Sequence, residues 1–203
     1  MQADKHRIVL ASNNSGKVRE INAMFAGGDI EIVSQSEFNV PEADETGLTF
    51  VENAIQKARN ACLHTNLPAL ADDSGIEIDA LNGRPGIYSA RYAGIDASDE
   101  DNLCKLMEEV KSLAEDQRLA RFVCVMVFLR HADDPIPLVA EGVWEGIALT
   151  EARGENGFGY DPMFYLPAHK CTSAELDPDE KNRISHRGKA LQLMLRKLSG
   201  VKV

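Results

Sequence analysis

The pattern of apolar and polar positions in the first part of the chain predicts strands separated by an amphipathic helix. An unbroken apolar run at 8–11 is typical of a short buried strand. After a polar loop, Val18, Ile21 and Phe25 share one face of a predicted helix. The stretch 30–34 predicts a second strand, so the chain opens as strand, helix and strand.

The next segment carries signals for the start of a helix and for two more strands. Thr49 precedes Glu52 by three residues, the spacing of a capping box, so a helix is predicted to begin there. The apolar run 67–71 predicts a strand. Ser74-Gly75 is expected to turn the chain into a second strand at 76–79, where apolar and acidic residues alternate.

The second half of the chain predicts one more helix and a long β-hairpin. Residues 83–94 contain several glycines and a proline and are predicted to be irregular. An apolar face predicts a helix at 99–111. Two β-type runs at 122–129 and 138–147 are separated by a hairpin connection at 131–135.

A last helix is predicted after Ser185, which is a suitable N-cap, because leucines and Met194 recur at helical spacing behind it. Alternating strands and helices followed by a long hairpin predict an α/β fold with a mixed β-sheet. We expect one domain over residues 1–203, in two lobes with a cleft between them, because no linker separates two halves.

Composition narrows the classes of function. The 203 residues are 44% hydrophobic and 27% charged, as in ordinary globular proteins, and the net charge is −10. A chain this acidic is a poor candidate for binding a nucleic-acid backbone. Its four cysteines are scattered, which favours reduced thiols in a cytoplasmic protein. The short apolar run near the start predicts neither a signal peptide nor a membrane span.

A polar loop between the first strand and the first helix is a candidate phosphate site. Main-chain N–H groups at a helix start favour anions, and a lysine there opposes the helix dipole unless an anion binds. The spacing does not fit a Walker loop, and a turn with a solvated lysine remains the alternative. The candidate residues are Ser12, Asn13, Asn14, Ser15, Gly16 and Lys17.

Two groups of acids are candidates for binding a metal ion. Asp72-Asp73 follows an apolar strand, where two carboxylates can hold Mg²⁺ and orient a water molecule. Because neighbours on an extended chain point to opposite faces, we expect only one to enter the cleft. Glu42, Asp44 and Glu45 precede the capped helix and offer a second carboxylate. The alternatives are an Asx turn for the pair and solvated acids for the loop.

A fourth cluster has the groups needed to bind a heterocycle. Its aromatic residue between glycines can stack on a base, and its charged side chains can form hydrogen bonds to a base edge. The alternative places the aromatic residues in the core and the basic residues in a helix first turn. The cluster consists of Phe158, Gly159, Tyr160, Asp161, Lys181, His186 and Arg187.

Together the four clusters contain the parts of a nucleotide hydrolase. The sequence also strongly resembles the non-canonical purine NTP pyrophosphatases, also called inosine triphosphate pyrophosphatases or XTP/dITP diphosphatases, most closely the bacterial branch. The matching stretches follow the family's order and run nearly end to end. They are L-A-S-N-N-S-G-K at 10–17, E-T-G-L-T-F-V-E-N-A at 45–54, A-D-D-S-G at 71–75, P-G-I-Y-S-A-R-Y at 85–92, G-F-G-Y-D-P at 157–162 and I-S-H-R-G at 184–188.

The resemblance implies an elongated α/β fold with a central cleft, a homodimer and Mg²⁺. It implies hydrolysis of ITP, dITP and XTP to the nucleoside monophosphate and pyrophosphate. By position, Asp73 matches the catalytic proton acceptor, and Asp44, Glu45 and Asp73 match the metal ligands. The loop at 12–17 matches the phosphate loop. Further substrate contacts are implied for Ser74, Phe158, Gly159, Tyr160, Asp161, Lys181, His186 and Arg187.

Two departures from the family pattern and two rival functions stay open. Many members have Thr-Gly where this chain has Ser12-Asn13, and asparagine lacks the backbone freedom of glycine. Relatives often place a lysine one position after Lys170, which therefore receives no role. One rival is a Maf-type pyrophosphatase that prefers modified pyrimidines, which the residues at 158–161 and the His186-Arg187 pair disfavour. The other is a catalytically silent nucleotide-binding regulator, which the intact acidic pair disfavours.

Overall fold

The computed structural model describes residues 6–25 and 30–200. The chain forms a mixed α/β fold in which helices flank a mixed β-sheet, which confirms the predicted fold class. The described residues divide into two compact units. Unit 1 contains the described residues up to Asp73, then Cys124–Glu141, and those from Lys189 on; unit 2 contains Ser74–Val123 and Gly142–Gly188.

Unit 1 is built on parallel strands from the start of the chain. Strand β1 (His6–Leu10) pairs in parallel with β2 (Ile30–Ser34) and with β3 (Ala69–Ile78). In register, Val9 lies opposite Ala69. The order continues through β5 (Leu119–Leu129) to β6 (Leu138–Ala148). Strands β3, β5 and β6 each contribute residues to both units.

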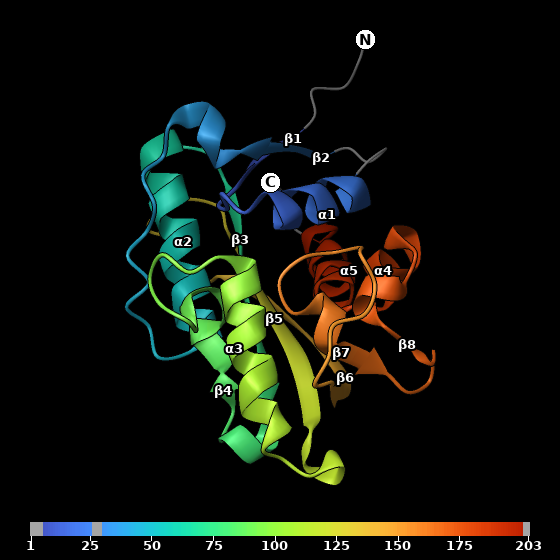
Figure 1. The fold of residues 1–203 in the computed structure, drawn as a ribbon. Coiled ribbons are helices and arrows are strands. Elements are labelled where there is room, and N and C mark those ends of the chain that lie inside the picture. The colour runs from blue at the N-terminus through green and yellow to red at the C-terminus, as the bar shows by residue number, and fades with distance from the viewer. Residues whose placement is uncertain (1–5, 26–29, 201–203) are drawn as a thin grey trace. The chain divides into compact units, whose positions relative to one another are not determined.

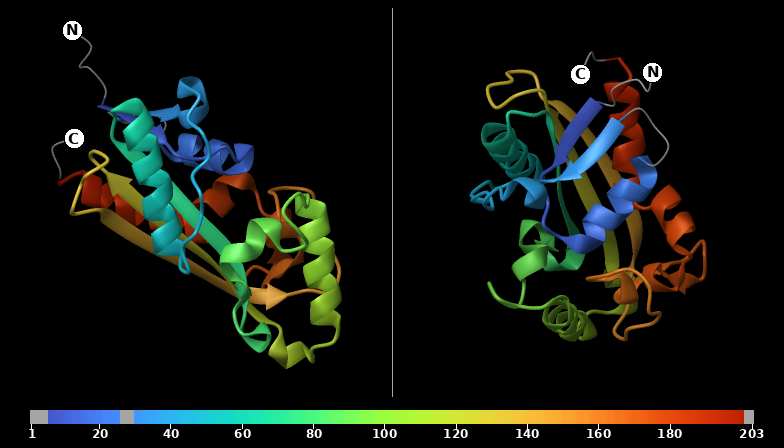
Figure 2. Two further views of the ribbon diagram at one scale, coloured as in Figure 1. Left: turned by 90° about the vertical axis from the view of Figure 1, so that its left-hand side faces the viewer. Right: turned by 90° about the horizontal axis from the view of Figure 1, so that it is seen from above.

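Helices cover both faces of the sheet in unit 1. Figure 1 shows α1 (Ser15–Phe25) close to β1 and β2. Apolar side chains of α1 and α5 (His186–Leu198) pack on one face, around residues such as Leu10 and Leu70. Helix α2 (Phe50–Thr65) packs on the other face with its alanines. The right-hand view of Figure 2 shows these layers of unit 1.

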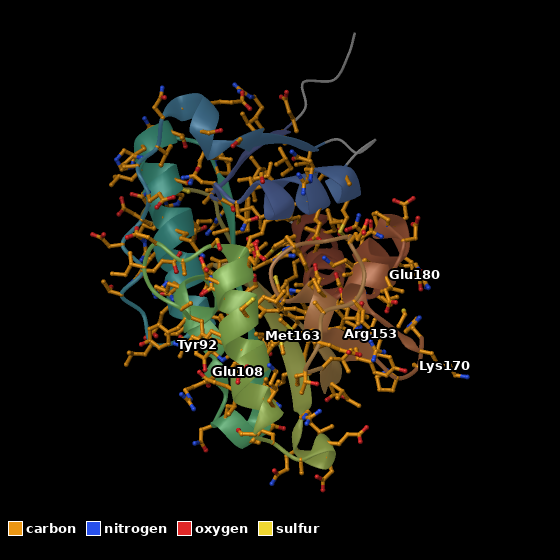
Figure 3. The ribbon with its side chains drawn as sticks, viewed as in Figure 1. Tyr92, Glu108, Arg153, Met163, Lys170 and Glu180 are labelled. Carbon is orange, nitrogen blue, oxygen red and sulfur yellow. The ribbon has the colours of Figure 1, made fainter. Side chains whose placement is uncertain are left out.

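Unit 2 has its own apolar core. Strand β4 (Arg84–Pro85) pairs antiparallel with β3, while β6, β7 (Phe164–Leu166) and β8 (Cys171–Thr172) pair antiparallel in series. Side chains of α3 (Asp99–Lys111) pack against Met163, which is fully buried and lies inside this unit in Figure 3. Helix α4 (Pro178–Ile184) completes the unit.

Short 3-10 helices connect several of these elements. They are η1 (Gln35–Phe38), η2 (Asp79–Leu81), η3 (Gly86–Arg91), η4 (Glu115–Gln117), η5 (Asp161–Met163) and η6 (Ser173–Glu175).

The predicted turn at Ser74-Gly75 is wrong, because β3 runs without a break through both residues. The glycine has a packing reason instead. A Cβ at Gly75 would lie 2.3 Å from the carbonyl oxygen of Gly86 and 2.5 Å from Ser89 Oγ. Gly75 therefore lets the segment after β4 approach the strand closely.

The predicted helix starts are confirmed, but the sequence pattern missed a helix. Thr49 Oγ1 accepts a hydrogen bond from Glu52 N, and Ser185 Oγ accepts one from Gly188 N. Helix α4 was missed because it is short, although Asp177 caps it and Pro178 occupies its first position. No helix in the described ranges is long and apolar enough to cross a membrane.

Candidate functional site

Residues 11–14 join β1 to α1 in unit 1, whereas Ser15, Gly16 and Lys17, which were predicted to belong to the loop, begin the helix. The polar side chains of this segment shape the start of the helix. Asn14 Oδ1 accepts from Lys17 N at 3.0 Å, and Ser12 Oγ accepts from Asn14 N at 3.3 Å. Asn14 is thus the N-cap of α1. The first turn, which begins Ser15-Gly16-Lys17, holds no acidic residue, so the positive end of the helix dipole remains available to an anion.

Asn13, one of the departures from the family pattern, causes no strain in the main chain. It is not among the residues with positive φ. Its Oδ1 accepts from Gln35 Nε2 at 2.9 Å, and its Nδ2 donates to Glu42 Oε1 at 3.1 Å. The asparagine side chain therefore links the segment before α1 to the segment that leads to Glu45.

Asp72 and Asp73 lie inside β3 and not at a strand end, which corrects the prediction and removes the Asx-turn alternative. Both are buried, with 1% and 6% of their surface exposed. Lys17 Nζ lies 3.0 Å from Asp72 Oδ2, whereas Lys57 Nζ lies 2.7 Å from Asp73 Oδ1. The two carboxylates therefore meet cations from α1 and from α2, the helices on opposite faces of the sheet, as strand geometry requires.

The surroundings of Asp73 include two residues that the sequence analysis did not assign. Asn53 Nδ2 donates to Asp73 Oδ2 at 3.3 Å, and Lys57 Nζ donates to Oδ1. Lys57 Nζ also lies 3.2 Å from Glu45 Oε1. The available signal was the spacing of Asn53 and Lys57, four residues apart on the inward face of the capped helix.

Burial and charge act against each other at this cluster. Burial raises the pKa of Asp73 above its usual value, and the nearby Lys57 and Lys17 only partly offset that effect. Burial alone would lower the pKa of Lys57, but Asp73, Asp72 and Glu45 outweigh it and raise the pKa. A carboxylate with a raised pKa beside a firmly charged ammonium is typical of a functional site.

The oxygen donors of this cluster fit Mg²⁺. Glu45 and Asp73 converge on a single cation, the ammonium of Lys57. Within 6–25 and 30–200, no group of three or more His, Cys, Asp or Glu side chains is arranged to hold a metal ion. Mg²⁺ uses one or two carboxylates together with substrate phosphates, so two suffice. Asp44 is exposed, and its carbonyl accepts from Thr46 N, so its role as a ligand stays a prediction.

In unit 2, Asp161 organises the cluster predicted to bind the base. The residue is buried, with 2% of its surface exposed. Oδ2 accepts from Phe158 N at 2.8 Å and from Lys181 Nζ at 2.6 Å, while Oδ1 accepts from Ser173 Oγ at 2.7 Å. These bonds hold the loop around Phe158 to α4. Gly157, at φ +78°, is needed because a Cβ there would lie 2.1 Å from Asp161 Oδ2.

Phe158 lies between glycines of positive φ and is only partly buried. Lys181 Nζ lies 5.0 Å and Arg187 Cζ 5.6 Å from the centre of its ring. Arg187 also donates to Ser74 Oγ at 3.0 Å. Unit 2 therefore places Ser74, Phe158, Lys181 and Arg187 near one another, as an aromatic ring with cationic donors.

Tyr160 and His186 are used in the packing of unit 2. The Tyr160 hydroxyl donates to the Ser89 carbonyl at 2.7 Å, and burial raises its pKa above the usual range. The His186 ring stacks on Phe122, with centres 4.6 Å apart and planes 11° from parallel. Both residues are about 95% buried in this unit. Their predicted contacts with substrate stay predictions, as does that of Gly159.

Lys170 stands apart from these clusters. It is exposed, has a φ of 55°, and precedes β8 at the surface of unit 2 in Figure 3. The structure gives it no part in either group of candidate residues.

Comparison with known proteins agrees with the family resemblance. The profile of the Ham1 family matches residues 8–197. The "dITP/XTP pyrophosphatase" of Thioalkalivibrio sulfidiphilus is 60% identical over 194 residues, 96% of this chain and 99% of that protein. The enzyme of the same name from Vibrio cholerae is 59% identical over 94% of this chain and 95% of its own. A solved HAM1 protein from Coxiella burnetii is 50% identical, with a TM-score of 0.89 over 97% of this chain and 100% of that one.

Proposed function

This chain belongs to the Ham1 family, and on that premise we propose that it hydrolyses non-canonical purine nucleoside triphosphates to the monophosphate and pyrophosphate. The substrates are dITP, XTP and ITP. It acts as a nucleoside-triphosphate diphosphatase on an acid anhydride bond, and removes these nucleotides from the pool used for nucleic-acid synthesis.

One observation carries this proposal. Asp73 is a buried carboxylate with a raised pKa, held by Lys57 and Asn53 and facing Glu45 across the same ammonium. A positioned carboxylate whose pKa is shifted towards neutrality is suited to accept a proton in hydrolysis. A nucleotide-binding regulator without turnover would not need this arrangement.

The residues of unit 1 act on the phosphates. Main-chain N–H groups at the start of α1 and the ammonium of Lys17 bind the triphosphate. Asp73 accepts a proton from the water that attacks the α-phosphorus, the α–β anhydride bond breaks, and pyrophosphate leaves. The position of attack follows from the resemblance to the family.

Mg²⁺ is part of the proposal, with Glu45 and Asp73 as the residues that would hold it and Asp44 as a third candidate. When bound, it supplies charge neutralisation for the triphosphate and polarisation of the phosphate oxygens. An acidic protein with a net charge of −10 needs such neutralisation to bind a polyanion.

The residues of unit 2 bind the base. Phe158 stacks on the purine, and Lys181 and Arg187 donate hydrogen bonds to O6 of hypoxanthine or xanthine. Adenine presents an amino group at this position, which two donors cannot satisfy. Sites built on such hydrogen bonds can reject a mismatched analogue by a factor of about 10⁴–10⁵ in kcat/KM.

We further propose that the protein is a cytoplasmic homodimer that binds neither nucleic acid nor membranes.

A product assay tests the function. Purified protein is incubated with ITP, XTP, GTP, ATP and pyrimidine triphosphates, with and without Mg²⁺, and the products are separated. We expect nucleoside monophosphate and pyrophosphate from ITP and XTP only when Mg²⁺ is present. Asp73→Asn should retain the fold and lose about 10²–10⁴-fold in kcat. Equal kcat/KM for ITP and ATP would exclude the proposed base pocket, and orthophosphate as product would exclude attack at the α-phosphorus.

A further inference from the structure

Asn53 connects two parts of unit 1, whose residues are proposed to act on the phosphates. It lies in the first turn of α2 and is fully buried. Its Oδ1 accepts from Gly47 N at 2.9 Å, and its Nδ2 donates to Asp73 Oδ2 at 3.3 Å. One side chain thus links the loop after Glu45 to the carboxylate in β3.

The orientation of the Asn53 amide follows from its partners. A main-chain N–H can only donate, so the amide oxygen must face Gly47 and the NH₂ group must face Asp73. Gly47 leaves room for this contact, because a Cβ there would lie 2.7 Å from Asn53 Oδ1 and 2.6 Å from Glu52 Cβ. The Asp73 side therefore always receives a donor and never an acceptor.

Helix α2 holds both oxygens of Asp73. Asn53 binds Oδ2, and Lys57, one helical turn later, binds Oδ1 at 2.7 Å. These two contacts differ in kind. Lys57 provides charge, whereas Asn53 is a neutral donor whose contribution is to fix the rotation of the carboxylate.

We propose that Asn53 is a positioning residue for the hydrolysis, which sets the orientation of the Asp73 carboxylate and ties it to the loop that carries Glu45. This inference rests on the proposed function of Asp73. The Nδ2 group of Asn53 orients the carboxylate, whereas its Oδ1 only fastens the loop at Gly47.

The chain offers a matched control in Gln56. This residue lies on the same helix, and its amide also fastens the same loop. Its Oε1 accepts from Thr46 N at 3.1 Å, and its Nε2 donates to Thr46 Oγ1 at 3.0 Å. Both hydrogen bonds of the Gln56 amide go to Thr46 and neither goes to Asp73, so Gln56→Ala tests the fastening of the loop alone.

The experiment compares Asn53→Asp, Asn53→Ala and Gln56→Ala with the wild type and with Asp73→Asn. Asn53→Asp keeps an acceptor for Gly47, loses the donor to Asp73 and adds a second carboxyl group beside it, while Asn53→Ala loses both hydrogen bonds and adds no charge. We expect both Asn53 variants to lose about 10- to 100-fold in kcat on ITP, with KM within about threefold of wild type. Gln56→Ala should retain kcat within about twofold.

Hydrogen exchange of the Gly47 amide, measured without nucleotide or metal, provides an independent reading. We expect faster exchange in Asn53→Ala and near-normal exchange in Asn53→Asp, with thermal unfolding confirming that each variant is folded. Loss of kcat in both Asn53→Ala and Asn53→Asp, with a protected Gly47 amide in Asn53→Asp, supports the inference.

Three outcomes would overturn it. They are wild-type kcat in Asn53→Asp, an equal loss of kcat in Gln56→Ala, or a rise in KM with unchanged kcat. If an Asn53 variant does not fold, Asn53→Ser, which retains a short donor and acceptor, replaces it and should fall between wild type and Asn53→Asp in kcat. Failure of the proposed function is seen separately, because the wild type itself would then release no pyrophosphate from ITP.

Discussion

The ammonium of Lys57 lies 2.7 Å from Asp73 Oδ1 and also 3.2 Å from Glu45 Oε1. A single lysine therefore contacts one carboxylate from a loop and one from a strand. It is largely buried, with 15% of its side chain exposed. Without this positive charge the two acids would repel each other at close range. Lys57 thus holds the two acids proposed to act on the phosphates together, and its charge opposes the rise in the pKa of Asp73 that burial causes.

The first prediction concerns the pH dependence of turnover. Burial raises the pKa of Asp73, and the charge of Lys57 opposes that rise. Asp73 must be ionised to accept a proton, so activity falls as the pH drops through its pKa. In Lys57→Met the pKa rises further, and the acidic limb of a plot of kcat/KM against pH should move to higher pH. Arg59→Met, on an exposed position of the same helix, should leave the limb in place. An unmoved limb in Lys57→Met would show that Lys57 does not control this ionisation.

The second prediction concerns binding of the triphosphate by Lys17. Lys17 lies at the start of α1, and its Nζ forms an ion pair with Asp72 of β3. In the proposal it binds phosphate and does not contact the base. Lys17→Ala should raise KM for ITP by about 10- to 100-fold, as expected for loss of a charged hydrogen bond. The ratio of kcat/KM for ITP and GTP should stay constant. A changed ratio with an unaltered KM would place Lys17 at the base and not at the phosphates.

The third prediction concerns Asp161, which the sequence analysis regarded as a base contact. In the structure its carboxylate receives bonds from Phe158, Ser173 and Lys181. Asp161→Asn removes the negative charge that faces the buried Lys181 and should destabilise the fold by about 3–5 kcal/mol. Chemical denaturation measures this loss. Asp99→Asn is the control, since Asp99 accepts from Gly159 in the same loop but is exposed. Equal, small losses in both variants would indicate that Asp161 is not a structural anchor.

The fourth prediction concerns stability at low pH. The bonds from Arg130 hold the pKa of Asp134 well below its usual range, although burial opposes them. Since the pKa of Asp134 is lowered in the folded state, the stabilisation is present above the unfolded pKa of about 4 and is lost as the pH falls through the folded pKa. Asp134→Asn should lower the free energy of unfolding by about 1–3 kcal/mol at pH 7. The gap between the two proteins should narrow below about pH 4, and a gap independent of pH would contradict this assignment.

The sequence by itself determined the features that depend on a few neighbouring residues. The caps Thr49 and Ser185 act within three residues, so their pattern is readable in the chain. The polar segment between the first strand and the first helix is readable for the same reason, because the apolar periodicity on each side is local, although the helix already begins at Ser15. The ordered set of motifs also identified the family, which the comparisons confirm.

Only the tertiary structure decided which side chains meet. The contacts of Asp73 with Asn53 and Lys57 join residues 20 and 16 positions apart, and they depend on how α2 packs against β3. The hydroxyl of Tyr160 finds its acceptor 71 residues away, at Ser89. Likewise Gly75, which resembles a turn residue in the sequence, lies within a continuous strand, where its missing Cβ leaves room for the Gly86 segment. Such contacts follow from the packing of segments that are distant in the sequence. Capping and periodicity cannot predict that packing, because the interactions behind them end within one or two helical turns.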